Sequence, residues 1–395
     1  MQFYCVNGSI QLPDGRVVQG HALCVEHGRI AAITDIDDVP PNAARIDLAG
    51  NLLAPGFVDL QANGGGGVLF NDNPSVDALR VIAQAQSRFG TTAFLPTLIS
   101  DDLDKIRVAI GAVNDAIALG VAGVIGIHLE GPFLNADRKG IHDAQKIRRM
   151  TDGDIDAILR HKPVTTLVTL APELVSDDQL HRLKSGGVLL CAGHTDGSFE
   201  EITASFAAGV DGVTHLFNAM SPLRARAPGA VGAALADPDC WCCIIVDGEH
   251  VHPETLKLAF RAKGSLDRFI LVTDAMPTVG QSDKEFILNG ERISAKDGVC
   301  KNADGTLAGS DLDMARAVQN CVDLLGMERA RAVELATLNP ARFLRAEKQF
   351  GTLQVGLAAN MVELRADGVV RRTWINGALV WDEATGCAPV AIAAA

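Results

Sequence analysis

The sequence predicts an α/β fold, a (β/α)8 TIM-type barrel with a small β-sandwich domain formed from both chain termini. In the middle of the chain, short apolar runs rich in β-branched residues alternate with helical patterns, as β and α units do in a parallel barrel. The chain has 395 residues, whereas a barrel alone uses about 250, which leaves room for one further small domain. Both ends of the chain have the pattern of short strands and turns.

The two ends of the chain are expected to form one domain together, because both consist of short strands separated by Gly-containing turns. We therefore assign residues 1–54 and 345–395 to the β-sandwich and residues 55–344 to the barrel. The predicted sandwich strands are Phe3–Val6, Arg16–Val18, His21–Glu26, Arg29–Ile33, Met361–Leu364, Val369–Ile375 and Ala378–Trp381.

Eight apolar runs are the predicted barrel strands. They are Gly56–Gln61, Thr92–Leu98, Val121–Glu130, Val164–Glu173, Val188–His194, Gly212–Asn218, Cys242–Asp247 and Arg268–Asp274. Between them, helical periodicity and capping residues predict helices, of which the clearest are Ser75–Phe89, Asp101–Leu119, Ser176–Lys184 and Pro253–Ala262.

Nearly every predicted barrel strand ends in a polar residue of a type used in catalysis. Since the carboxyl ends of parallel barrel strands converge on one mouth, residues far apart in the sequence are expected to share one pocket there. These strand-end residues are Gln61, Asn63, Thr97, Glu130, Glu173, His194, His215, Asp247, His250 and Asp274.

Composition and charge exclude several classes of protein. Hydrophobic residues make up 48% and charged residues 21%, which is typical of globular proteins. The net charge of −13 without a basic block argues against a nucleic-acid or anionic-membrane partner, so an anionic substrate would need a few local cations. No signal-peptide pattern or membrane-span pattern is found, and we expect a cytoplasmic protein. The nine cysteines have no paired spacing and are expected to be reduced and mostly buried.

Glu130, His194 and His215 are the predicted metal ligands. Two histidines and one carboxylate that leave a position open for water form the donor set of a hydrolytic zinc site. The alternatives are a buried Glu130 paired with a helix cap and histidines with structural roles. His128 lies two residues before Glu130 on the same face and is assigned to the core or to the surroundings of the ligands.

Asp274 is the predicted general base for the water activated at the metal, and it could then return the proton to the leaving amine. The alternative is a helix N-cap, although no periodic helix starts directly after it. The glycine run after Asn63 does not match the nucleotide-binding pattern G-x-G-x-x-G. Its glycines are expected to let a loop bend close beneath the substrate.

Taken together, eight short motifs resemble the amidohydrolase superfamily and, within it, the N-acetylglucosamine-6-phosphate deacetylase family. The likeness runs over essentially the whole chain, and the order of the motifs is more specific than any one of them. The motifs are Pro55-Gly-Phe-Val-Asp59, His128-Leu-Glu-Gly-Pro-Phe133, Lys139-Gly-Ile-His142, Gly193-His-Thr195, His215-Leu-Phe-Asn-Ala-Met220, Asp247-Gly-Glu-His250, Val272-Thr-Asp274 and Leu307-Ala-Gly-Ser310.

The resemblance implies a role for each matching residue. Glu130, His194 and His215 would bind the metal, Asp274 would be the acid and base, and His142 would polarise the acetamide carbonyl. It also implies a homodimer in which Arg226 reaches the phosphate across the interface. The implied substrate-binding residues are Gln61, Ile141, His142, Asn218, Ala219, Arg226, His250 and the Leu307–Gly309 loop with Leu307, Ala308 and Gly309.

One departure from the superfamily pattern bears on the number of metals. The first barrel strand usually ends His-x-His, whereas here Gln61 and Asn63 stand at these positions. Neutral amides are poor ligands for a second transition metal, so one divalent ion is expected, with Gln61 hydrogen-bonded to the attacking water. Zinc is the first choice for this ion, and iron, cobalt or manganese would also fit the donors.

The activity implied by the resemblance is metal-dependent hydrolysis of a linear amide C–N bond, the acetamide of N-acetyl-D-glucosamine 6-phosphate. The products would be D-glucosamine 6-phosphate and acetate. Two alternatives stay open. The first is a deacetylase for N-acetylgalactosamine 6-phosphate or a related N-acyl sugar phosphate, because no motif recognises the C4 hydroxyl. The second is a barrel that binds a sugar phosphate without catalysis, against which the intact set of ligands, His142 and Asp274 argues.

Overall fold

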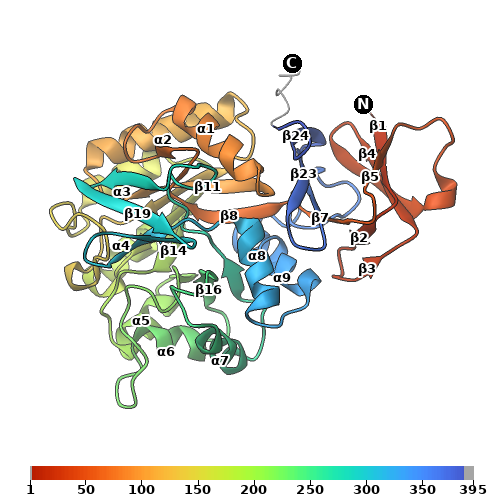
Figure 1. Cartoon of the computed structure of the whole chain (residues 1–395). Coiled ribbons are helices and arrows are strands. Elements are labelled where there is room, and N and C mark those ends of the chain that lie inside the picture. The colour runs from red at the N-terminus through yellow and green to blue at the C-terminus, as the bar shows by residue number, and fades with distance from the viewer. Residues whose placement is uncertain (1, 387–395) are drawn as a thin grey trace.

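The structure, a computed structural model, describes residues 2–386 and confirms the predicted barrel (Figure 1). Eight parallel strands form one sheet that curves into a barrel. Their order in the sheet is β17-β16-β15-β14-β13-β12-β11-β8. These bounds are β8 (Phe57–Ala62), β11 (Thr91–Ile99), β12 (Gly126–Glu130), β13 (Thr165–Leu170), β14 (Leu189–Ala192), β15 (Gly212–Val213), β16 (Trp241–Ile244) and β17 (Phe269–Leu271).

Helices surround this sheet, and those predicted from the sequence agree to within two residues at each end. Ser75 caps the first helix by accepting a hydrogen bond from the Ala78 N–H, and Pro253 opens the seventh. The helices are α1 (Val76–Ser87), α2 (Leu103–Ala118), α3 (Asp152–His161), α4 (Asp177–Ser185), α5 (Phe199–Ala207), α6 (Gly229–Ala236), α7 (Pro253–Lys263), α8 (Met314–Asp323), α9 (Arg329–Leu335) and α10 (Leu338–Phe343).

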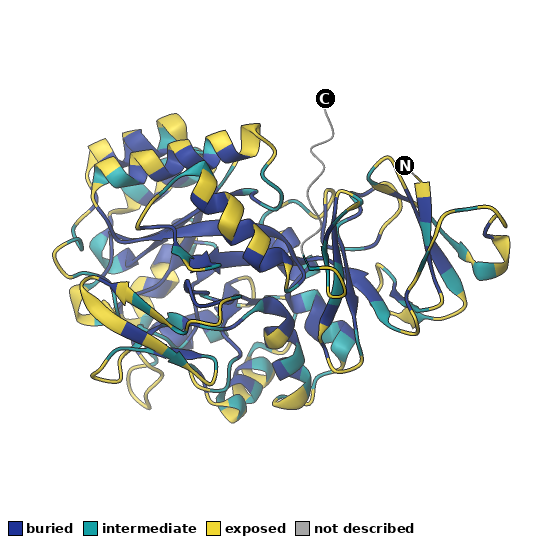
Figure 2. Ribbon diagram, turned by 45° about the horizontal axis from the view of Figure 1, so that its top comes forward, coloured by how far each residue is buried: buried dark blue, intermediate teal, exposed yellow. Residues whose placement is uncertain are grey.

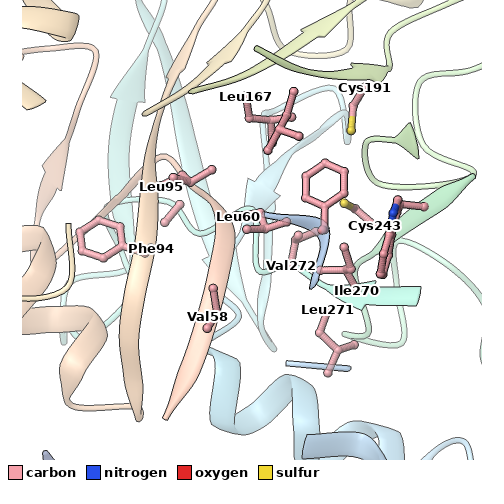
Figure 3. Packing of buried hydrophobic residues seen from close by; sticks show 14 of the residues in the cluster. Val58, Leu60, Phe94, Leu95, Leu167, Cys191, Cys243, Ile270, Leu271 and Val272 are labelled. Atoms are coloured by element: carbon pink, nitrogen blue, oxygen red, sulfur yellow. The ribbon is translucent and has the colours of Figure 1, made fainter. Parts of the chain in front are cut away.

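The core fills the barrel and the layer between the barrel and its helices. Figure 2 shows the barrel strands buried, while the outer faces of the helices are exposed. Figure 3 shows the packed side chains, among them Leu60, Leu167, Cys191 and Cys243. The eight cysteines of the described part of the chain are free and buried, as predicted. No described helix combines the length and the apolar character that crossing a membrane requires.

The barrel closes between its first and last strands through Asp59. Its carboxylate accepts hydrogen bonds from the Thr273 hydroxyl at 2.5 Å, the Thr273 N–H at 3.3 Å and the Gln61 N–H at 3.1 Å. The Asp274 N–H also donates to the Gln61 carbonyl at 2.9 Å. Burial raises the pKa of Asp59 to about 7, against the effect of the Thr273 hydrogen bond. These contacts fix the strand end that carries Asp274 relative to the one that carries Gln61.

Replacing Asp59 by Ala is expected to lower the free energy of unfolding by about 3 kcal/mol, because the buried donors of Thr273 and Gln61 lose their acceptor. Urea denaturation measures this change. The isosteric Asp59→Asn variant is the control, since its amide oxygen still accepts the backbone N–H groups, and it should cost less than about half as much. Equal losses in both variants would contradict this role of the carboxylate oxygens.

Strands from both ends of the chain form the small β domain beside the barrel, red and blue in Figure 1. In its six-stranded sheet, β7 (Leu52–Pro55) pairs with β2 (Ser9–Gln11) from the N-terminal part and with β22 (Met361–Leu364) from the C-terminal part. The other strands of this sheet are β3 (Val17–Val18), β23 (Val370–Ile375) and β24 (Ala378–Asp382); the second sheet consists of β1 (Gln2–Val6), β4 (His21–Glu26), β5 (Arg29–Asp35) and β6 (Arg45–Asp47).

A buried cluster that includes Phe3, Ile10, Leu53 and Trp374 lies between these strands, and it supplies the core of a sandwich. Because β7 leads into β8 through Gly56 alone, the small domain is joined directly to the barrel. The domain boundaries after residue 54 and before residue 345 stay a prediction.

A four-stranded antiparallel sheet between β17 and α8 was not predicted from the sequence. It consists of β18 (Glu285–Leu288), β19 (Glu291–Lys296), β20 (Val299–Lys301) and β21 (Leu307–Ser310). The expected Leu307–Gly309 loop was therefore wrong, because these residues belong to β21. A bridge between Ser310 and Ala275 attaches this sheet to the last barrel strand, directly after Asp274.

Candidate functional site

A cavity of about 320 Å³ lies at the carboxyl ends of the barrel strands, where the sequence analysis placed the site. Strand β21 contributes Leu307 and Gly309 to its wall, and the turn before this strand contributes Thr306. The remaining lining residues are Asn63, Ile99, Glu130, Asp137, Arg138, Gly140, Ile141, His142, His194, His215, Asn218, Ala219, Ile245, His250, Asp274 and Met276.

Glu130, His194 and His215 come together at the base of this cavity. The Oε1 atom of Glu130 lies 2.9 Å from Nε2 of His215 and 3.2 Å from Nε2 of His194, and the two nitrogens are 3.2 Å apart. One donor atom of each residue lies within 4.8 Å of those of the other two. Burial opposes the ionisation of Glu130, but the adjacent side chains of His194 and His215 lower its pKa well below its usual range.

These residues fit a divalent metal ion. Nδ1 of His194 lies 2.8 Å from the carbonyl oxygen of Arg138, which can only accept a hydrogen bond. In a neutral His194, Nδ1 therefore carries the proton and the Nε2 lone pair points towards the Glu130 carboxylate and Nε2 of His215. Such a convergence of lone pairs repels unless a cation lies among them. These two imidazoles and one carboxylate therefore form a candidate site for a metal ion, here named the metal-binding group.

His194, His215 and Asp274 have left-handed backbone conformations that are rare outside glycine. The φ angles are 48° for His194, 32° for His215 and 53° for Asp274. Such conformations cost about 1–3 kcal/mol each, and they persist only where surrounding contacts determine them. Because the chain turns at these residues, the predicted strand ends were wrong: β14 ends at Ala192, and β15 ends at Val213 rather than Asn218.

Two amide side chains donate to Asp274, and that of Gln61 also links it to the metal-binding group. Nδ2 of Asn63 donates to Oδ1 of Asp274 at 2.5 Å. Nε2 of Gln61 lies 3.1 Å from the same oxygen and 3.1 Å from both carboxylate oxygens of Glu130. Burial and then the charge of Glu130 raise the pKa of Asp274 to about 6. No helix starts at Asp274, since the next described helix is α8, so its N-cap alternative is wrong.

His142 faces the histidines of the metal-binding group, with its ring centre 4.5 Å from that of His194. Burial and then the neighbouring His194 lower the pKa of His142 to about 3, so the imidazole is neutral near pH 7. Nδ1 lies 3.3 Å from the Ser100 backbone N–H, which can only donate, and 2.7 Å from the Ser100 hydroxyl. The proton therefore lies on Nε2, where His142 can donate a hydrogen bond.

Most residues implied to contact the substrate line the cavity, namely Ile141, His142, Asn218, Ala219, His250, Leu307 and Gly309. Nδ1 of His250 is fixed at 2.5 Å from Oδ2 of Asp247. Ala308 lies between the lining residues Leu307 and Gly309 on β21; it is fully buried and does not line the cavity. Arg226 is exposed on the turn between the bridged residues Arg224 and Ala227, and it does not line the cavity of the single chain.

His128 lies where it was expected, and a basic residue of the cavity was not predicted. His128 is buried between the hydroxyls of Thr97 at 3.3 Å and Thr169 at 2.8 Å, which places it in the core. Asn63 lines the cavity, as expected for a strand-end residue, but its hydrogen bond to Asp274 was not predicted. Arg138 also lines the cavity and was not predicted as a site residue. The sequence carries no signal for Arg138, which reaches the cavity from the short 3-10 helix Ala136–Arg138.

Comparison with known proteins shows the family to which this chain belongs. A model of the amidohydrolase family matches residues 52–380, so this chain belongs to the amidohydrolase family. Over 377 residues it is 38% identical to an N-acetylgalactosamine-6-phosphate deacetylase from Shewanella sp. (strain ANA-3), with 95% of each chain covered. Over 364 residues it is 35% identical to an N-acetylglucosamine-6-phosphate deacetylase from Vibrio furnissii, which covers 91% of this chain and 90% of the relative.

The structure is also similar to a crystal structure of N-acetylglucosamine-6-phosphate deacetylase from Pasteurella multocida. The TM-score is 0.93 at 32% sequence identity, and the match covers 96% of this chain and 99% of the other. The likeness therefore includes both the barrel and the small β domain.

Proposed function

We propose that this chain is an enzyme of amino-sugar catabolism that hydrolyses the acetamide of N-acetyl-D-glucosamine 6-phosphate to D-glucosamine 6-phosphate and acetate. The observation that carries the proposal is that Glu130, His194, His215, His142 and Asp274 line one cavity. The names of the relatives from Vibrio furnissii and Pasteurella multocida support the same substrate. The location in the cytoplasm stays a prediction.

Glu130, His194 and His215 would hold one divalent metal per subunit. We propose zinc, and iron, cobalt or manganese would accept the same donors. When bound, such an ion polarises the acetamide carbonyl and lowers the pKa of water towards about 7. Gln61 and Asn63 offer amides and no imidazole beside this group, which supports a single metal.

Asp274 acts as base and then as acid. Asn63 and Gln61 both donate to its Oδ1 atom, so Oδ2 is the oxygen that takes the proton of the attacking water. The water oxygen bonds to the acetyl carbon while Nε2–H of His142 donates to the carbonyl oxygen, where negative charge develops. Asp274 then protonates the amine nitrogen as the C–N bond breaks, which yields acetate and the free amino sugar.

The sugar phosphate would be held by residues in and around the cavity, namely Gln61, Ile141, Asn218, Ala219, His250, Leu307, Ala308 and Gly309. The phosphate also needs a guanidinium or ammonium group. Arg138 lines the cavity but already pairs with Asp196 at 2.7 Å. We therefore propose a homodimer in which the exposed Arg226 binds the phosphate in the cavity of the neighbouring subunit.

Replacing Arg226 by Ala is expected to raise the KM for the phosphorylated sugar about 10–100-fold, because one charged hydrogen-bonding partner of the phosphate is lost. The metal content should not change. Steady-state kinetics measures the effect, and Arg224→Ala on the same exposed turn is the matched control. Mixing the Arg226→Ala and Asp274→Asn variants should restore activity in exchanged dimers. No recovery in dimers shown to have exchanged would contradict action across the interface.

A second candidate substrate is N-acetylgalactosamine 6-phosphate. The observation that favours it is the 38% identity to the Shewanella relative, which is named for this epimer. Side-by-side measurement of kcat/KM on both phosphorylated epimers and on unphosphorylated N-acetylglucosamine decides between them. A higher value for the glucosamine epimer supports the first proposal, and a higher value for the galactosamine epimer replaces it. Binding of the sugar phosphates without turnover would contradict both enzymatic proposals.

A further inference from the structure

Glu173 lies in the short 3-10 helix Pro172–Leu174 after β13, next to the segment that follows His194, and it does not line the cavity. Its carboxylate accepts three hydrogen bonds. Oε1 accepts from Nδ2 of Asn135 at 3.0 Å and from the Asp196 N–H at 2.9 Å. Oε2 accepts from the Thr195 hydroxyl at 2.5 Å. One carboxylate therefore joins the segment that follows β12 to the segment that follows β14.

Both segments hold His194. The Asn135 N–H donates to the His194 carbonyl at 2.9 Å, and the Arg138 carbonyl lies 2.8 Å from Nδ1 of the same imidazole. The guanidinium of Arg138 lies 2.7 Å from Asp196, two residues after His194. The loop that starts at Asn135 continues to His142. The position of His142 relative to His194 therefore depends on how these two segments are joined.

We propose that Glu173 is a positioning residue that holds His194 in its left-handed conformation and fixes the loop of His142 beside it. The part that concerns His142 rests on the proposed function. The φ angle of 48° at His194 requires such external support, because a non-glycine residue does not favour it. Without Glu173, the Asn135 amide, the Thr195 hydroxyl and the Asp196 N–H lose their common acceptor, and both segments can move apart.

The test compares Glu173→Ala and Glu173→Gln with the unmodified chain. Zinc affinity is measured by competition with a chromogenic chelator, and the geometry of the site by the visible absorption of the Co²⁺-loaded protein. Removal of a partner that orients a metal ligand typically costs about 10–100-fold in metal affinity. We expect this loss and a changed Co²⁺ spectrum in Glu173→Ala, with an intermediate loss in Glu173→Gln, whose single amide oxygen can replace only part of the contacts.

At saturating zinc, Glu173→Ala is also expected to lower kcat for the sugar phosphate about tenfold, because His142 is displaced from the carbonyl it polarises. Thr195→Val removes a single donor to Glu173 and provides a milder variant if Glu173→Ala does not fold. Thr195→Val should lose less zinc affinity than Glu173→Ala. Thr195→Ser keeps the hydroxyl and should retain the zinc affinity of the unmodified chain. Glu201→Gln is the matched control, because within residues 2–386 this carboxylate accepts only from the Ser198 N–H at the start of α5.

Unchanged zinc affinity and an unchanged Co²⁺ spectrum in Glu173→Ala, even with lower thermal stability, would overturn the proposal. The same holds if Glu201→Gln loses as much affinity as Glu173→Ala. If the affinities change as expected but the unmodified, zinc-loaded chain releases no acetate, the proposed function fails while the positioning of His194 by Glu173 stands.

Discussion

Asp274→Asn is expected to lower kcat about 10²–10⁴-fold, the range typical of losing a general acid and base. The asparagine oxygen can still accept from Asn63 and Gln61, so the geometry of the site is retained. The amide that replaces Oδ2 cannot take a proton from water or return one to the amine. Metal content should stay near that of the unmodified chain, because Asp274 is not among the grouped donor atoms. Rapid measurement of acetate release gives kcat.

The control for Asp274→Asn is Asn63→Ala, which removes one donor to Oδ1 but leaves the carboxylate in place. It should cost far less, about tenfold or below, since a single neutral hydrogen bond is lost. A kcat of Asp274→Asn within about threefold of the unmodified chain would show that another group carries the proton, and the assigned mechanism would have to be abandoned.

Removal of the metal is expected to lower activity by roughly 10³-fold, because the polarising effect of such an ion is worth several kcal/mol. Dialysis against a chelator followed by titration with zinc measures both the loss and the recovery. Glu130→Gln should abolish recovery at the same zinc concentrations, since the neutral amide replaces the anionic ligand between His194 and His215.

Glu363→Gln is the matched control for Glu130→Gln. Glu363 is also a fully buried glutamate, but it lies in the small β domain, where it pairs with Arg371 and Arg372. Its replacement should affect stability and leave metal content unchanged. Activity that survives complete removal of metal, or equal loss of metal in both variants, would argue against Glu130, His194 and His215 as the metal ligands.

The barrel and the position of the cavity could be predicted because both depend on patterns of apolar and polar residues that can be recognised in the sequence. Buried parallel strands appear as apolar runs, and the polar residue after each run marks the end that faces the mouth. Glu130 and Asp274 were found in this way. The helices were predicted closely for the same kind of reason, since Ser75 and Pro253 mark helix starts through local hydrogen bonding and backbone geometry.

What could not be predicted depends on tertiary contacts. Strands β14 and β15 are short because the chain turns at His194 and His215, which have left-handed conformations. A sequence does not indicate such a conformation at a residue other than glycine. Arg138 reaches the cavity through its pairing with Asp196, a contact between two loops. The strands β18 to β21 are different, because Asn289-Gly290 and Asp297-Gly298 are hairpin signals that could have revealed them.

The most direct test of the central claim is the rate of acetate release from N-acetyl-D-glucosamine 6-phosphate, measured as a function of zinc bound per chain. If the Glu130, His194 and His215 group carries the reaction, the rate should rise in proportion to bound zinc and reach its maximum at one ion per chain. A full rate in metal-free protein, or no acetate release from chains that hold one zinc ion each, would contradict the account.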